Sequence, residues 1–243
     1  MIESGVGGLM RLSPGDFETI RAYIAFAKER LESEGLTFRV SLDMREFKNF
    51  LLEQPNTHGV PPTHDPDRCV LTEANSFWSY LETEDGRRIA CNAQRLFLTD
   101  DFIEACQTQT AFMDRMPVID QTPADITREA AGLDIRGRLD IGGGTWIHPD
   151  WRGRELLVYA RMSRAVALRH WLWDWIVGFA FNTPNRRAMA LTGMGYSRAV
   201  PFINGHYPPH GPEQHRDIQL TFGHRDEFMS QLRDELDRRA VAA

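Results

Sequence analysis

Residues 146–171 of the chain read WIHPDWRGRELLVYARMSRAVALRHW. An apolar pair leads into the turn-forming His-Pro-Asp of residues 148–150, then into the basic Arg-Gly-Arg of residues 152–154, and then into a long helical pattern. Free backbone N–H groups and the helix dipole favour anions at a helix start. The stretch therefore predicts a strand that ends at Ile147, a helix over residues 154–171, and a site between them for a ligand that carries phosphate.

The composition limits the class of protein. The 243 residues are 42% hydrophobic and 26% charged, which is ordinary for a globular domain with a substantial core. The net charge of −6 argues against general nucleic-acid binding, which requires a basic surface. We see neither an export signal nor an apolar run long enough for a bilayer, and Cys69, Cys91 and Cys106 lack metal-type spacing. We therefore expect a cytoplasmic protein with free thiols and with no nucleic-acid or membrane partner.

Hydrophobic periodicity predicts one α/β domain over residues 1–243. In chain order the predicted elements are a short strand at 9–12, a helix over 13–32, a helix over 43–53, a hairpin of strands 77–82 and 88–98, a helix over 101–115, an irregular connection over 116–138, strand 139–147, helix 154–171, strand 173–181, a helix from residue 185, strands near 196–207 and 216–222, and a helix over 225–239. The loop over 54–68 is long enough to be a flap.

The middle of the chain carries the information on sheet topology. A strand, a helix and a second strand in this order form a right-handed crossover, so strands 139–147 and 173–181 should be parallel neighbours with helix 154–171 across one face. The hairpin before them adds antiparallel strands. The fold class is therefore a mixed central sheet with flanking helices.

Arginine is concentrated in the second half of the chain. Residues 150–200 hold eight arginines and three acidic residues. Arginines that cover apolar surface on a solvated helix face would explain this excess. A confined anionic ligand near the start of helix 154–171 would explain it as well.

Two segments resemble the GNAT superfamily of N-acyltransferases. The segment IHPDWRGRELL (147–157) is similar to the strand-to-helix segment of that family, and NRRAMALTGMGYSRA (185–199) is similar to a later helix and strand. The resemblance is specific over residues 140–200 and topological elsewhere. It implies a GNAT-like single domain with an insertion around 99–138, and it implies acyl-CoA as cosubstrate, with pyrophosphate at the helix start and pantetheine between two splayed parallel strands.

The resemblance also implies the residues that bind the cosubstrate. The phosphate motif of the family, Gln/Arg-x-x-Gly-x-Gly/Ala, falls on residues that keep the arginine but replace both later small residues, by Glu155 and Leu157. Leu157 should push the ligand outward or require a shifted helix start, and Glu155 is either a helix-start acid or a residue that deters pyrophosphate. The expected binding residues are Trp146, Ile147, His148, Arg152, Gly153, Arg154, Glu155, Leu156 and Asn185.

The catalytic positions of the family are poorly matched. The usual carboxylate would fall among the three glycines of residues 142–144, so Asp140 is the nearest candidate base, acting through water; a solvated Asp at a strand start is the alternative. The usual tyrosine acid would fall on Leu191 or Thr192, and only the threonine has a hydroxyl. His206, His210, His215 and His224 match no familiar metal site, so we expect surface or substrate-lining histidines and no bound metal.

Three functions remain open at this point. The first is transfer of an acyl group from acyl-CoA to an amine of a small molecule. The second is an N-acyl amino acid or acyl-homoserine lactone type of synthase that takes its acyl chain from acyl-carrier protein. The third is a GNAT-shaped domain that binds a ligand or a protein without turnover. The sequence leaves open whether the chain forms a homodimer.

Overall fold

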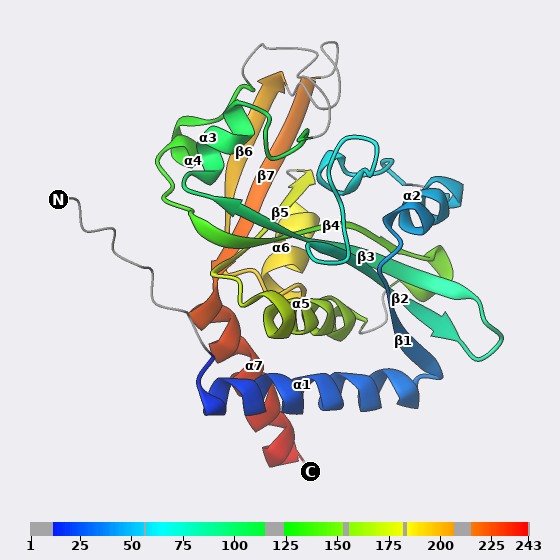
Figure 1. Cartoon of the computed structure of the whole chain (residues 1–243). Coiled ribbons are helices and arrows are strands. Elements are labelled where there is room, and N and C mark those ends of the chain that lie inside the picture. The colour runs from blue at the N-terminus through cyan, green and yellow to red at the C-terminus, as the bar shows by residue number, and fades with distance from the viewer. Residues whose placement is uncertain are drawn as a thin grey trace.

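The computed structural model describes residues 12–55, 57–114, 124–152, 156–181, 184–206 and 215–242. Its centre is a seven-stranded sheet in the order β1-β2-β3-β4-β5-β7-β6 (Figure 1). The strands are β1 (Leu36–Ser41), β2 (Ser76–Thr83), β3 (Arg88–Thr99), β4 (Gly137–Ile147), β5 (Trp175–Phe181), β6 (Arg198–His206) and β7 (His215–His224). Neighbouring strands are antiparallel except β4 and β5, which are parallel. The predicted mixed sheet and its parallel pair are confirmed.

Helices cover both faces of the sheet (Figure 1). One face carries α1 (Pro14–Ser33), α5 (Leu157–Trp171), α6 (Pro184–Gly193) and α7 (Arg225–Ala242), and the other carries α2 (Met44–Glu53), α3 (Phe102–Gln107) and α4 (Arg128–Ala131). The largest buried cluster lies between the sheet and the first group. Two smaller clusters lie under α2 and under the pair α3 and α4. No helix in the described ranges is both long and apolar enough to cross a membrane.

Local sequence signals account for the helix boundaries. Ser13 caps α1, because its side chain accepts from the backbone N–H of Asp16 at 3.0 Å and Pro14 supplies the first helical residue. Asp43 caps α2 in the same way. At its other end, α5 stops at Leu172, which adopts a left-handed conformation with φ 52° and so ends the helix directly before β5.

The parallel pair separates halfway along its length. β4 and β5 pair only from Leu139 with Trp175 to Gly142 with Gly178. Beyond that point β4 stays with β3, through a register shift between Cys91 and Ala93, whereas β5 stays with β7 up to Phe181. The two strands therefore enclose a wedge-shaped gap in the middle of the sheet, as the resemblance implies for the pantetheine site.

The prediction differs from the structure at β1, at the helix over 101–115 and at the connection over 116–138. The sequence-based prediction missed strand β1, whose six residues lie between two strong helices. The helix predicted over 101–115 ends at Gln107, because Gln109 has φ 65° and starts a turn. The connection predicted as irregular holds the short helix α4, while the strand predicted at 9–12 lies almost wholly outside the described residues. The segment between β3 and β4 packs on β5, β6 and β7, with a bridge from Ile126 to Ile203.

Candidate active site

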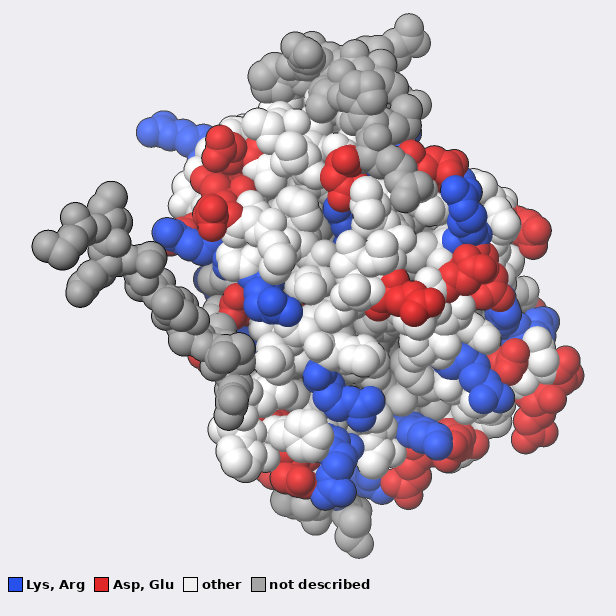
Figure 2. Space-filling view, in the orientation of Figure 1, with Lys and Arg blue, Asp and Glu red and all other residues white. Residues whose placement is uncertain are grey.

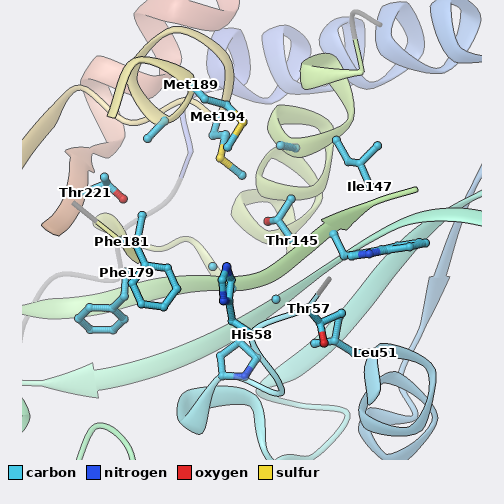
Figure 3. Close-up of a pocket in the computed structure, with 18 of the residues that line it drawn as sticks. Leu51, Thr57, His58, Thr145, Ile147, Phe179, Phe181, Met189, Met194 and Thr221 are labelled. Carbon is cyan, nitrogen blue, oxygen red and sulfur yellow. The ribbon is translucent and has the colours of Figure 1, made fainter. Parts of the chain in front are cut away.

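A pocket of about 460 Å³ occupies the gap between β4 and β5. Its lining comes from both faces of the sheet: Leu156, Met189 and Met194 from the side of α5 and α6, and Leu51 with residues 57–63 from the side of α2. Figure 3 shows the two methionines and Leu51 on opposite sides of β4. The pocket therefore passes through the sheet at the point where the parallel strands separate.

Several of the residues predicted to bind the cosubstrate line the pocket. Ile147, Arg152 and Leu156 line it near the start of α5, and Trp146 lines it from the side of α2, where it packs against Phe50. The Nε of Arg152 donates to the carbonyl oxygen of Ile147 at 3.1 Å, and its side chain is exposed at the mouth. The indole of Trp146 donates to the carbonyl oxygen of Pro55 at 3.1 Å. The end of β4 and the side chain of Arg152 are therefore in contact.

Of the other predicted site residues, His148 does not line the pocket, and the rest lie wholly or in part outside the described residues. The ring Nδ1 of His148 accepts from the backbone N–H of Asp150 at 3.3 Å, so this histidine orders the turn. Gly153, Arg154 and Glu155 lie outside the described residues. Asn185 and Thr192 belong to α6, but their side chains are outside the described set.

The start of α5 is shifted relative to the prediction. The helix begins at Leu157, and its N-cap residue, Leu156, makes no side-chain capping hydrogen bond. The Leu157 side chain packs against α6 so closely that a Cβ on Gly193 would lie 2.2 Å from its Cδ1. Of the two outcomes predicted for Leu157, the structure shows the shifted helix start.

Several of the described arginines of residues 150–200 make structural contacts. Arg161 forms an ion pair with Glu235, and Arg198 forms one with Glu227. Arg187 donates to the carbonyl oxygen of Ala199 at 3.0 Å. Over the face shown in Figure 2, basic and acidic side chains are interspersed. Among the described residues, Arg152 is the arginine that lines the pocket.

Tyr196 is a site residue that the sequence-based reasoning did not identify. Its hydroxyl lines the gap, where it accepts from Nη2 of Arg164 at 2.7 Å and lies 3.4 Å from the carbonyl oxygen of Val177. A Cβ on Gly178 would lie 2.1 Å from this hydroxyl and one on Gly142 would lie 3.2 Å from it. The tyrosine therefore reaches the last paired residues of both strands because both are glycines.

Asp140 lies on the same side of the sheet but is fully buried and does not line the pocket. The Gln94 amide, oriented with its nitrogen toward the carboxyl, donates to Oδ1 at 2.9 Å and Oδ2 at 3.2 Å and accepts from the Ser163 hydroxyl. Burial raises the pKa of Asp140 to about 8, against the opposing effect of the Arg164 charge. The alternative of a solvated Asp at a strand start is therefore wrong, and a role through water stays a prediction.

The loop predicted as a flap supplies a buried histidine to the opposite side of β4. His64 Nε2 lies 3.0 Å from the carbonyl oxygen of Ile141, and its Nδ1 lies 2.8 Å from the Thr63 hydroxyl. Because a carbonyl only accepts, Nε2 carries the proton and Nδ1 accepts from Thr63. Burial, with a smaller contribution from Arg95, lowers the pKa of His64 to about 3, so the ring is neutral. A Cβ on Gly143 would lie 2.8 Å from this ring.

The remaining predictions concern metals and thiols. No group of three or more His, Cys, Asp or Glu side chains in the described ranges is placed to hold a metal ion. Of the four candidate histidines, His224 pairs with Asp226 and contacts the ring of Trp175, whereas the other three side chains are not described. All three cysteines are free and buried.

Comparison with known proteins gives matches at the level of three-dimensional structure. No family model and no curated protein matches the chain. NAA60 of Arabidopsis thaliana, solved with acetyl-CoA, is 10% identical over 78% of this chain and 99% of its own, with a TM-score of 0.45. The polyamine N-acetyltransferase of Drosophila melanogaster is 15% identical over 77% and 99%, with a TM-score of 0.42. A chimera of Vibrio cholerae spermidine N-acetyltransferase SpeG and hSSAT is 9% identical over 81% and 99%, with a TM-score of 0.46.

The sequence identities and the TM-scores are low, so the fold class rests on the strand order and on the separation of β4 from β5. By those two features, the chain has a GNAT-like central sheet.

Proposed function

We propose that the protein is a divergent GNAT acyltransferase that moves an acyl group from acyl-CoA to an amine of a small molecule. The observation that carries this proposal is the pocket through the sheet, with a tyrosine hydroxyl at the point where the parallel strands separate. A thioester held there is accessible from one face of the sheet to its carrier and from the other to an attacking amine.

The backbone of β4 provides the means to hold the carrier. Beyond Gly142 the edge of β4 that faced β5 is no longer paired with it. Unpaired strand edges offer N–H and C=O groups to an extended ligand, and the amide groups of pantetheine are suited to them. At the far end of this edge lie Arg152, which supplies charge for phosphate, and the uncapped start of α5.

The reaction then needs a group that donates a proton to the departing sulfur and a group that accepts the proton of the amine. The amine nitrogen bonds to the carbonyl carbon, the carbon–sulfur bond breaks, and the thiolate takes the hydroxyl proton of Tyr196. Arg164 donates to the same hydroxyl oxygen, which directs the hydroxyl proton away from itself and stabilises the charge left on the oxygen. In the described lining, His58 is the side chain whose ring nitrogen is placed to accept a proton from the amine.

The proposal is tested by binding and by turnover. Calorimetry with CoA and acetyl-CoA should give a saturable heat, and acetyl-CoA mixed with a set of primary amines should release free thiol and yield acetylated amine by mass spectrometry. Absence of binding to CoA and to every acyl-CoA tried would exclude the proposed function and favour the non-catalytic domain.

A further inference from the structure

We call the part of the pocket on the side of α2 the apolar lobe. It is lined by Leu51, His58, Val60, Pro61, Phe179 and Phe181. Figure 3 shows His58 and Phe181 side by side below the gap, with Phe179 next to them. The lobe lies on the opposite face of the sheet from α5 and α6, so it is the space from which an acceptor would reach the thioester.

The aromatic side of this lobe is held in place by packing. The ring of Phe179 contacts the rings of Phe102, Phe112 and Phe202, with centroids 5.5 to 6.1 Å apart. The rings of His58 and Phe181 meet edge to face at 4.6 Å. Aromatic groups in such arrangements present a fixed apolar surface, and that surface favours a flat or aromatic partner.

The charges around the pocket oppose a polycationic ligand. The described lining contains no Asp, no Glu and no Lys, and its one permanent charge is the cation Arg152. A monoamine loses its single ammonium charge when it becomes the nucleophile. A polyamine retains at least one further ammonium group, which would enter an apolar space whose described lining offers no carboxylate to pair with it.

We propose that the acceptor, on the function proposed above, is a primary amine carried by an apolar and preferably aromatic body, and that polyamines are excluded. Phe181 is then a residue that determines specificity. It lies at the end of β5, is half-buried and lines the lobe. The lobe would accept the body of the amine while the amino group points at the gap.

A panel of acceptors with acetyl-CoA tests this inference. We expect 2-phenylethylamine and hexylamine to have kcat/KM values at least about 10-fold above those of spermidine and agmatine. If spermidine or agmatine is the better acceptor, the inference is overturned but acyl transfer stands. If octanoyl-CoA strongly outcompetes acetyl-CoA, the lobe holds the acyl chain and the inference is also overturned. If no amine reacts and acetyl-CoA does not bind, the proposed function itself fails.

Two variants of Phe181 sharpen the test. Phe181→Ala should lower kcat/KM for 2-phenylethylamine by about 10- to 100-fold and leave the affinity for acetyl-CoA unchanged. Phe181→Glu should reverse the preference and raise the relative rate with agmatine, because it adds the missing carboxylate. Phe17 in α1, 45% exposed and outside the pocket, provides the matched controls Phe17→Ala and Phe17→Glu. An unchanged acceptor preference in both Phe181 variants, with the fold intact, would contradict the inference.

Discussion

The guanidinium of Arg164 donates to the hydroxyl of Tyr196 at 2.7 Å, directly beside the last paired residues of β4 and β5. The central carbon of this guanidinium, Cζ, lies over the tyrosine ring at 4.3 Å from its centroid, so the two side chains also make a cation–π contact. Arg164 is itself buried and is anchored to the carbonyl oxygen of Ala160. The pair holds one hydroxyl group at the position where the proposed reaction needs a proton.

Removal of this hydroxyl tests its role. Tyr196→Phe should lower turnover by about 10²–10⁴-fold, the usual contribution of a general acid, while the affinity for acetyl-CoA stays within a factor of about three. The measurement is kcat by thiol release together with calorimetric titration of acetyl-CoA. Tyr80→Phe is the matched control, since Tyr80 lies on β2 outside the pocket. Equal rates for wild type and Tyr196→Phe would assign the proton to another group or to water.

Gly178 provides a second test of the same geometry. A Cβ at this position would lie 2.1 Å from the Tyr196 hydroxyl and 2.8 Å from its Cζ, so Gly178→Ala must displace the ring. We expect a loss of about 1–3 kcal/mol in the free energy of unfolding, as for other overpacked sites, and a fall in turnover. Gly15→Ala is the control, because its nearest atom lies 3.8 Å away. Urea unfolding of both variants measures the difference, and equal stability would show that the ring moves at no cost.

The sequence predicted the sheet well because its signals there are local. The glycines, the turn and the helix pattern of residues 142–171 are consecutive, so periodicity and the crossover rule place the parallel pair correctly. β1 was missed because its strand character depends on pairing with β2 and not on its own six residues. The helix predicted over 101–115 was too long because Gln109 adopts a left-handed conformation, which hydrophobic periodicity does not reveal.

Sequence-based reasoning found residues of the pocket lining where they are close in the chain. Trp146, Ile147, Arg152 and Leu156 all line the pocket, and their role in binding the cosubstrate stays a prediction. Tyr196 and Arg164 are 32 positions apart and meet only because α5 and the segment between α6 and β6 face the same gap. Tyr196 did have a sequence signal, since it follows Gly195 at the end of the later family segment, but a motif match does not show that its hydroxyl points between two strands.

Arg152 should contribute to binding through the charged end of CoA. Arg152→Ala should weaken CoA by about 1–3 kcal/mol, as expected for a charge-assisted contact with phosphate. Pantetheine, which lacks phosphate, should bind wild type and variant equally well. Arg136→Ala is a suitable control, because Arg136 is exposed and pairs with Asp134 away from the pocket. If the variant lost affinity for both ligands alike, the arginine would act through the strand end that it contacts at Ile147.

The buried carboxyl of Asp140 predicts a pH dependence of stability. Its pKa is raised to about 8 in the folded protein, above the ordinary value of 3.8. The folded state therefore binds more protons than the unfolded state between these pH values, and the free energy of unfolding falls as pH rises through this window. His64, whose pKa is lowered to about 3, has the opposite effect below its ordinary value of 6.5. Between pH 6.5 and 8 His64 no longer contributes, and the fall in the free energy of unfolding caused by Asp140 remains.

Asp140→Asn isolates this contribution. At pH 5 the folded wild type holds a neutral carboxyl while its unfolded state has lost that proton, so the linkage effect is already present there and grows with pH. Asn does not titrate, so the stability of the variant relative to the wild type should rise by about 3 kcal/mol between pH 5 and pH 8. Urea unfolding at pH 5, 6.5 and 8 gives the comparison, with Asp134→Asn as an exposed control that should show no such trend. A difference between Asp140→Asn and wild type that is constant with pH would mean that the carboxyl stays charged beside Arg164, and a base at Asp140 would then regain support.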